Sequence, residues 1–223
     1  MLQKKSKKIT LYLFIFLIIG TLNNKNLNNI KLPKVNQIIV SGLNVKNNLE
    51  LMNNLNYLKF DSLFFLNEIK LTEIITTNNL VEEYSVFKKY PSTLDIKIKQ
   101  TKFLAQFKKN GINFLLGSNG RLTKTPDIKK NIPFIFGDFK TKSFFELKKI
   151  IDETDLDFYE IKNLYFFRSG RWDIETVSGL LIKLPKKNIK SSLNLFIDIL
   201  ENNIQEKISK IDLRQYNQII INE

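Results

Sequence analysis

The chain has 223 residues, a formal net charge of +13, and neither cysteine nor histidine. This length suffices for one ordinary domain or two small ones. The two absent residue types exclude disulfides, thiol catalysis and every histidine-based triad or metal site. A basic balance suits anionic partners such as lipid headgroups, nucleic acids or acidic protein surfaces, although here the lysines are scattered along the chain.

The most distinctive segment is an uncharged run, Ile9–Leu22, that follows a lysine-rich start. Such a pattern is typical of a signal peptide or a membrane anchor. As a helix the run is only about 21 Å long, against a hydrocarbon core of about 30 Å. An uncleaved anchor is favoured, because no small-x-small cleavage site follows and the first alanine is Ala105. A cleaved signal peptide and a buried helix of a soluble protein remain alternatives.

We therefore expect a cytoplasmic basic tail at residues 1–8, a transmembrane signal-anchor at 9–22 and a linker at 23–34. A first folded unit spans residues 35–101. Its patterns predict, in order, a strand, two helices and two strands. The predicted elements are Val35–Ser41, Val45–Leu58 (capped by Asn44, with Val45, Leu49, Met52 and Leu55 on one face), Leu66–Thr77, Val81–Phe87 and Thr93–Lys99.

A second, strand-rich unit with flanking helices spans residues 102–223, so the fold class is α+β. Asn110-Gly111 predicts a hairpin, and Ser143 with Glu146 matches a capping box at the start of a helix. Other predicted elements are strands at 132–136 and 160–167, a hairpin over Arg171–Leu184, a helix at 188–200 and strands at 210–214 and 217–221.

Five motifs in this order resemble those of the FtsQ/DivIB family of bacterial cell-division proteins. They are Ile38–Asn44 (IIVSGLN), Tyr90–Ala105 (YPSTLDIKIKQTKFLA), the hairpin and turn Gly111–Arg121, the RWD…G…LP pattern from Arg171 to Pro185, and Ile211–Arg214 (IDLR). Two features depart from the family pattern: Ser118-Asn119-Gly120 replaces its usual acidic turn, and the anchor and linker are short.

The resemblance implies a POTRA domain at 35–101 and an FtsQ-type β-domain at 102–223. It implies a non-enzymatic, single-pass inner-membrane scaffold of the divisome, with most of the chain in the periplasm at the division septum. Its partners are then single-pass division proteins like FtsB and FtsL and other divisome components, with no nucleic acid, cofactor or small-molecule substrate. A membrane-anchored POTRA protein of secretion or envelope assembly is the alternative.

Residues 211–221 are the candidate partner-binding segment, because an edge strand offers unpaired backbone groups to a partner strand. We expect the contacts to involve Leu213, Arg214 and Tyr216, with Arg168 and Arg171 framing the same face. An internal strand pair and ordinary surface arginines are the competing interpretations. Trp172 is expected in the core.

Catalysis without histidine or cysteine would need paired carboxylates or serine–lysine chemistry. The acidic residues between Asp152 and Glu160 lack the glycine that an EF-hand loop requires at its sixth position, so they are interpreted as a solvated connection. Strand aromatics with basic charge leave a nucleic-acid role as a third, disfavoured possibility. We therefore predict no enzymatic activity.

Overall fold

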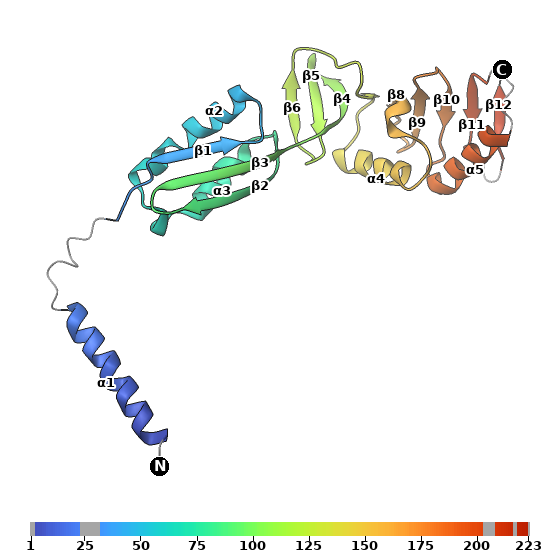
Figure 1. Ribbon diagram of the computed structural model, residues 1–223. Coiled ribbons are helices and arrows are strands. Elements are labelled where there is room, and N and C mark those ends of the chain that lie inside the picture. Colours follow the sequence, from blue (N-terminus) through green and yellow to red (C-terminus); the bar gives the residue numbers. More distant parts are fainter. Residues whose placement is uncertain (1–2, 23–31, 203–207, 216–217, 223) are drawn as a thin grey trace.

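The computed structural model describes residues 3–22, 32–202, 208–215 and 218–222. Two sheets follow one another along the chain, a three-stranded sheet and then a nine-stranded one (Figure 1). Each has its own hydrophobic core. The mixed α+β class predicted from the sequence is confirmed.

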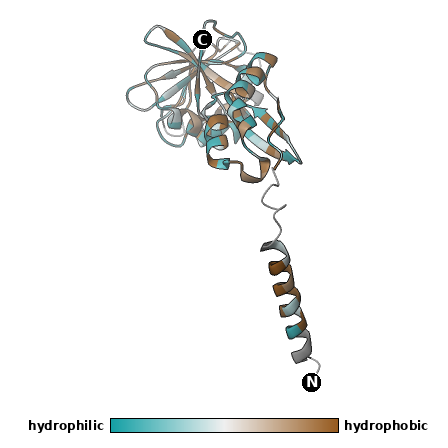
Figure 2. Ribbon diagram, turned by 90° about the vertical axis from the view of Figure 1, so that its left-hand side faces the viewer, coloured by the Kyte–Doolittle hydropathy of each residue, from teal (hydrophilic) through white to brown (hydrophobic). Residues whose placement is uncertain are grey.

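The uncharged run forms the C-terminal part of helix α1 (Gln3–Leu22), which begins among the N-terminal lysines. Figure 2 shows its strongly hydrophobic ribbon. Within the described residues, none of the helices combines the length and the apolar character that a membrane span requires.

The first folded unit has the predicted β-α-α-β-β order, with two short 3₁₀ turns between its helices. Its central strand pairs parallel with the first strand and antiparallel with the second, which gives the order β1-β3-β2. The elements are β1 (Gln37–Ser41), α2 (Val45–Asn54), η2 (Asn56–Phe60), η3 (Leu63–Phe65), α3 (Glu68–Thr77), β2 (Val81–Lys89) and β3 (Thr93–Gln100).

The buried face of α2 differs from the predicted one. Asn44 caps the helix as expected, because its side chain accepts from the Asn47 N–H at 2.8 Å. The α-helix, however, ends at Asn54 instead of Leu58, and Val45 and Leu49 are exposed. The buried stripe consists of Leu51, Leu55 and Leu58, whose spacing also follows one helical face. The prediction that Val45 and Leu49 lie on the buried face of this helix was therefore wrong.

The second unit contains the nine-stranded sheet and two α-helices. Its strand order is β12-β11-β10-β9-β8-β7-β4-β5-β6. The elements are β4 (Phe103–Lys109), β5 (Ile112–Gly117), β6 (Leu122–Thr125), β7 (Phe134–Phe136), α4 (Thr141–Asp152), η4 (Phe158–Glu160), β8 (Ile161–Phe166), β9 (Trp172–Thr176), β10 (Leu181–Lys183), α5 (Ile189–Asn202), β11 (Lys210–Asp212) and β12 (Ile220–Asn222).

The capping box predicted at Ser143 does not form. Helix α4 begins at Thr141, with Lys140 as its N-cap residue and no side-chain cap. Ser143 lies inside the first turn, where its hydroxyl donates to the Lys140 carbonyl at 2.8 Å. The motif was correct in residue type but lies about one turn too far along the helix to cap it.

Helices α4 and α5 pack on the same face of the sheet (Figure 1). Phe144 and Leu147 from α4 and Leu193 and Phe196 from α5 are buried against it. Trp172 is also buried in this core, as predicted. On β9, β10 and β11, the side chains that point away from this core therefore lie on the sheet face that the helices do not cover.

Side-chain hydrogen bonds from the turn between β5 and β6 connect the second unit to the first. The Asn119 amide donates to the carbonyls of Asn79 and Val81, both at 2.9 Å. Arg121 donates to the Asn78 carbonyl at 3.2 Å, just beyond the end of α3. The turn that departs from the family motif thus contributes to the domain junction.

Candidate partner-binding edge

The outermost strand of the long sheet at its C-terminal end is β12. Strand β11 lies one position inside it, because it pairs parallel with β10 and antiparallel with β12. The segment 211–221 therefore contains both an internal strand and an edge strand. The internal strand pair considered in the sequence analysis is therefore present, and its outer member β12 forms the edge of the sheet.

The hydrogen-bond pattern determines which backbone groups of β12 face outward. The Leu181 N–H donates to the Ser209 backbone carbonyl, and the Leu213 N–H donates to the Lys183 backbone carbonyl. In a parallel ladder, alternate residues of β11 bond to β10, so Asp212 directs its backbone groups toward β12. Its partner there is Ile220.

The next residue of β12, Ile221, therefore points its N–H and C=O away from β11. It pairs with Ile211 but, by the alternation of an antiparallel ladder, forms no hydrogen bonds with that residue. This unpaired backbone is the group that an added strand would use.

A row of charged side chains leads to this edge on the sheet face opposite the helices. Asp173 lies opposite Lys183, and Lys183 lies opposite Asp212. Directly paired residues share one face of a sheet, so the three side chains form one row across β9, β10 and β11. Ile220 continues the row on β12.

Two arginines border this row. The Nε of Arg171 lies 3.1 Å from a carboxylate oxygen of Asp173, and its guanidinium lies 4.3 Å from the centre of the Phe167 ring. The Nε of Arg214 donates to both carboxylate oxygens of Asp212, at 2.7 and 2.9 Å.

The two carboxylates respond differently to their surroundings. Burial raises the pKa of Asp173, and Arg171 only partly opposes that effect. For Asp212, hydrogen bonds from Arg214 outweigh burial and lower the pKa. Burial and the positive charge of Lys210 lower the pKa of Lys183 between them. The row is thus a network of paired charges, and Asp173 is the member whose charged form is most disfavoured by burial.

The five sequence-predicted contact residues have different environments. Arg214 is partly exposed, Arg168 is exposed in the β8–β9 turn, and Arg171 is half-buried by its contacts. Leu213 is only 2% exposed, so its side chain packs in the core and is not presented to a partner. Tyr216 lies outside the described residues.

Sequence reasoning missed Lys183 and the carboxylates of Asp173 and Asp212 as members of one site. The alternation in each strand shows that Asp173 points away from the core. The pairing of β10 with β11, however, joins segments separated by a whole helix, and no local motif encodes that register.

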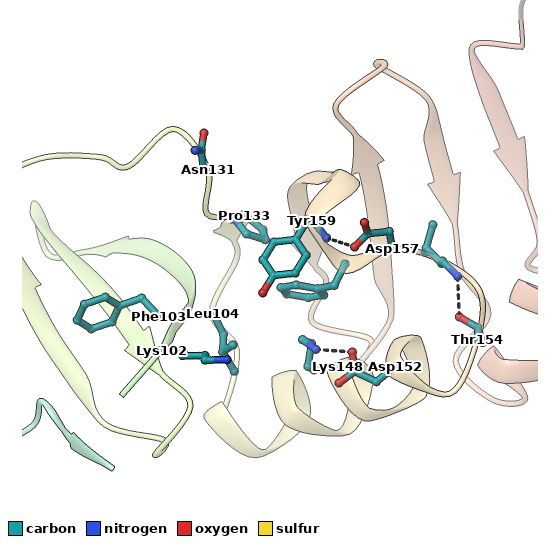
Figure 3. Close-up of a pocket in the computed structure, with 12 residues that line it drawn as sticks. Lys102, Phe103, Leu104, Asn131, Pro133, Lys148, Asp152, Thr154, Asp157 and Tyr159 are labelled. Atoms are coloured by element: carbon teal, nitrogen blue, oxygen red, sulfur yellow. Dashed lines mark hydrogen bonds and ion pairs between the residues drawn. The ribbon is translucent and has the colours of Figure 1, made fainter. Parts of the chain in front are cut away.

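A cavity of about 270 Å³ lies elsewhere in the second domain, between the start of β4 and the end of α4 (Figure 3). Two of its polar side chains have partners in the cavity wall. Lys148 is bonded to Asp152, and Asp157 accepts from the Tyr159 backbone N–H at 2.8 Å. We place the candidate site at the strand edge instead, because an edge strand offers unpaired backbone groups to a partner.

Known proteins share both folded units. The family model "POTRA domain, FtsQ-type" matches residues 34–100, and "Cell division protein FtsQ/DivIB, C-terminal" matches residues 105–214. The cell division protein FtsQ of Rickettsia bellii is 28% identical over 206 residues, covering 84% of this chain and 72% of that protein. FtsQ of Rickettsia typhi is 24% identical over 198 residues, with the same two coverages.

Among solved structures, the major extracytoplasmic domain of DivIB from Geobacillus stearothermophilus is a weaker likeness. It has a TM-score of 0.35 and 15% identity, and the match covers 48% of this chain and 96% of that one. The two family models together with the FtsQ relatives show that the chain belongs to the FtsQ/DivIB family of cell division proteins.

Proposed function

We propose that this cell division protein is a non-catalytic scaffold of the divisome that links and recruits other division proteins at the septum. The expected partners are FtsB and FtsL-like single-pass proteins. The observation that carries the proposal is the outward-facing backbone of Ile221 on the edge strand β12. A partner segment would extend the nine-stranded sheet by one strand.

The charge row supplies a second recognition element beside that edge. Arg214 is partly exposed although it is paired with Asp212, so an acidic partner side chain could share its guanidinium. Arg168 is exposed, and in the described part of the chain it has no ion pair. Both favour a partner segment with acidic residues.

We further propose that α1 holds the protein in the inner membrane, with the folded units in the periplasm. The uncharged run is shorter than a bilayer core, but lysine side chains at its start can reach the headgroups while their stems stay in apolar surroundings. A reporter fused after Glu223 tests this topology. Cytoplasmic behaviour of the reporter would contradict it.

Strand addition is tested by crosslinked co-purification of the full-length chain from dividing cells, with Ile221→Pro compared against Ile221→Ala. Both variants lose the isoleucine side chain, but only proline lacks the outward N–H. We expect Ile221→Pro to lose most of the captured FtsB-like protein and Ile221→Ala to retain it. Equal capture by both variants would move the binding site away from β12.

The same experiment addresses the alternative role in secretion or envelope assembly. If the wild-type chain captures outer-envelope or secretion components and no division proteins, the scaffold proposal fails. A chain truncated before Ile208 provides the coarser control, because it removes β11 and β12 together.

A further inference from the structure

One end of the first domain exposes four aromatic side chains, which we call the aromatic end. Each is more than half exposed, and Phe65 reaches 78%. The rings of Phe64 and Tyr90 lie 4.9 Å apart, so the members from η3 and from the β2–β3 turn form one surface. The set comprises Phe60, Phe64, Phe65 and Tyr90. Clustered exposed aromatics of this kind mark a site of contact.

The aromatic end is where the chain arrives from α1. The Val35 N–H donates to the Asp61 carbonyl at 2.9 Å, and Asn36 donates to Ser92 at 2.8 Å. The backbone of Lys34 forms an isolated antiparallel β-bridge with that of Ser62. The linker therefore joins the domain beside these same segments, and Figure 2 shows hydrophobic ribbon at this end.

The linker limits how far this surface can lie from α1. Residues 23–34 separate the last residue of α1 from Val35, and a fully extended chain of that length spans about 40 Å. If α1 is anchored in a bilayer, the aromatic end is the part of the first domain tethered nearest to the lipid.

The charges around the aromatic end suit a lipid surface. Lys34 and Lys59 are exposed, and neither has an ion pair within the described residues. Two carboxylates near this end are already paired with lysines, Glu68 with Lys88 and Asp95 with Lys89, both at 2.7 Å. Lys34 and Lys59 are therefore the cations at this end that remain available to lipid phosphates.

We propose that the aromatic end inserts into the headgroup region of the membrane that holds α1. This inference rests on the anchoring proposed above. Aromatic rings favour the boundary between headgroups and acyl chains, and neighbouring lysines can pair with lipid phosphates. Insertion orients the first domain on the bilayer and directs the long sheet away from it. The four exposed aromatic side chains would then lie among the lipid headgroups.

The test uses the full-length chain in vesicles of phosphatidylcholine and phosphatidylglycerol, with and without brominated acyl chains that quench tryptophan. Phe65→Trp places the probe at the aromatic end. Tyr159→Trp is the matched control, because Tyr159 is also 78% exposed but lies in the second domain. The native Trp172 is buried in both variants and gives a common background.

We expect brominated lipid to quench at least half of the added emission of Phe65→Trp and almost none of that of Tyr159→Trp. Equal quenching of the two variants would overturn the proposal. A blue-shifted but unquenched Phe65→Trp would also overturn it, because self-association would then cover the surface.

Failure of the anchor is detected separately with Tyr12→Trp in α1. If Tyr12→Trp is quenched and Phe65→Trp is not, the anchor stands and the aromatic-end proposal fails. If only Phe65→Trp is quenched, the aromatic end binds lipid and the anchor fails. If neither is quenched, both proposals are overturned.

Discussion

Replacement of Arg171 by methionine tests whether the charge row orders the C-terminal strands. Arg171 bonds to Asp173 at 3.1 Å, and the Asp173 side chain is only 4% exposed. Methionine keeps much of the apolar stem but removes the charge and the hydrogen bonds. Asp173 is then left with the more distant charge of Lys183 and the weak influence of the Leu184 N–H, which itself donates to the Trp172 carbonyl at 3.2 Å.

The expected cost at pH 7 is about 3 kcal/mol of unfolding free energy. Removing one partner of a buried ion pair costs about 3–5 kcal/mol, and the low end applies because the Arg171 side chain is 23% exposed. Burial already raises the folded-state pKa of Asp173, and the variant raises it further. Stability must therefore fall more steeply in the variant as pH rises above the ordinary carboxyl pKa of about 3.9.

The assay is urea unfolding of the full-length chain in non-ionic detergent, followed by tryptophan fluorescence. The chain has a single tryptophan, Trp172, which is buried beside Asp173 and reports the second domain. The deficit of Arg171→Met should shrink between pH 7 and pH 4.5, because protonation neutralises Asp173. The double variant Arg171→Met/Asp173→Asn should recover part of the loss at pH 7. A deficit that is equal at both pH values, with no recovery, would refute the reasoning.

Three further predictions concern other parts of the fold. Gly42→Ala should lower the free energy of unfolding by about 4 kcal/mol or more in thermal unfolding, because Gly42 has a φ of +108° and an added Cβ would lie 1.7 Å from the Ile98 carbonyl oxygen. Gly111→Ala should cost only about 1–2 kcal/mol, because Gly111 also has a positive φ but has open space around it. Gln106→Met should cost about 3 kcal/mol in urea unfolding, because buried Gln106 bonds to the backbone of Lys129 and Ile132 through three hydrogen bonds; an unchanged midpoint would contradict this. Arg214→Ala should reduce stability above pH 4 and lose its effect in acid, because Arg214 lowers the folded-state pKa of Asp212; a deficit that grows in acid would have the wrong sign.

Local patterns predicted most of the fold. Asn44 caps α2 as expected, and Asn110 and Gly111 both adopt the positive φ of a tight hairpin turn. Trp172, which was expected in the core, is buried there. These features depend on neighbouring residues, so one sequence suffices to identify them.

The errors arose where tertiary packing chose between local alternatives. Both Leu49 and Leu51 belong to plausible helical stripes, and only the position of the sheet buries Leu51 instead of Leu49. Similarly, Leu213 lies within the predicted partner-binding segment 211–221, but its side chain packs into the core. The charge row was missed for the same reason, because the β10–β11 register brings Lys183 and Asp212 together from distant segments.

The position of β11 inside the edge determines how binding experiments must be interpreted. Leu213 is buried and Arg214 is bonded to Asp212, so changes at either residue disturb β11 as well as any partner contact. Arg171→Met acts two strands further in and should reduce partner capture only in proportion to the loss of stability. Ile221→Pro, by contrast, should lose most of the capture at nearly unchanged stability, because it removes an N–H that none of the described strands uses. Only that uncoupling of capture from stability distinguishes an edge that binds a partner strand from a domain that simply has to be folded.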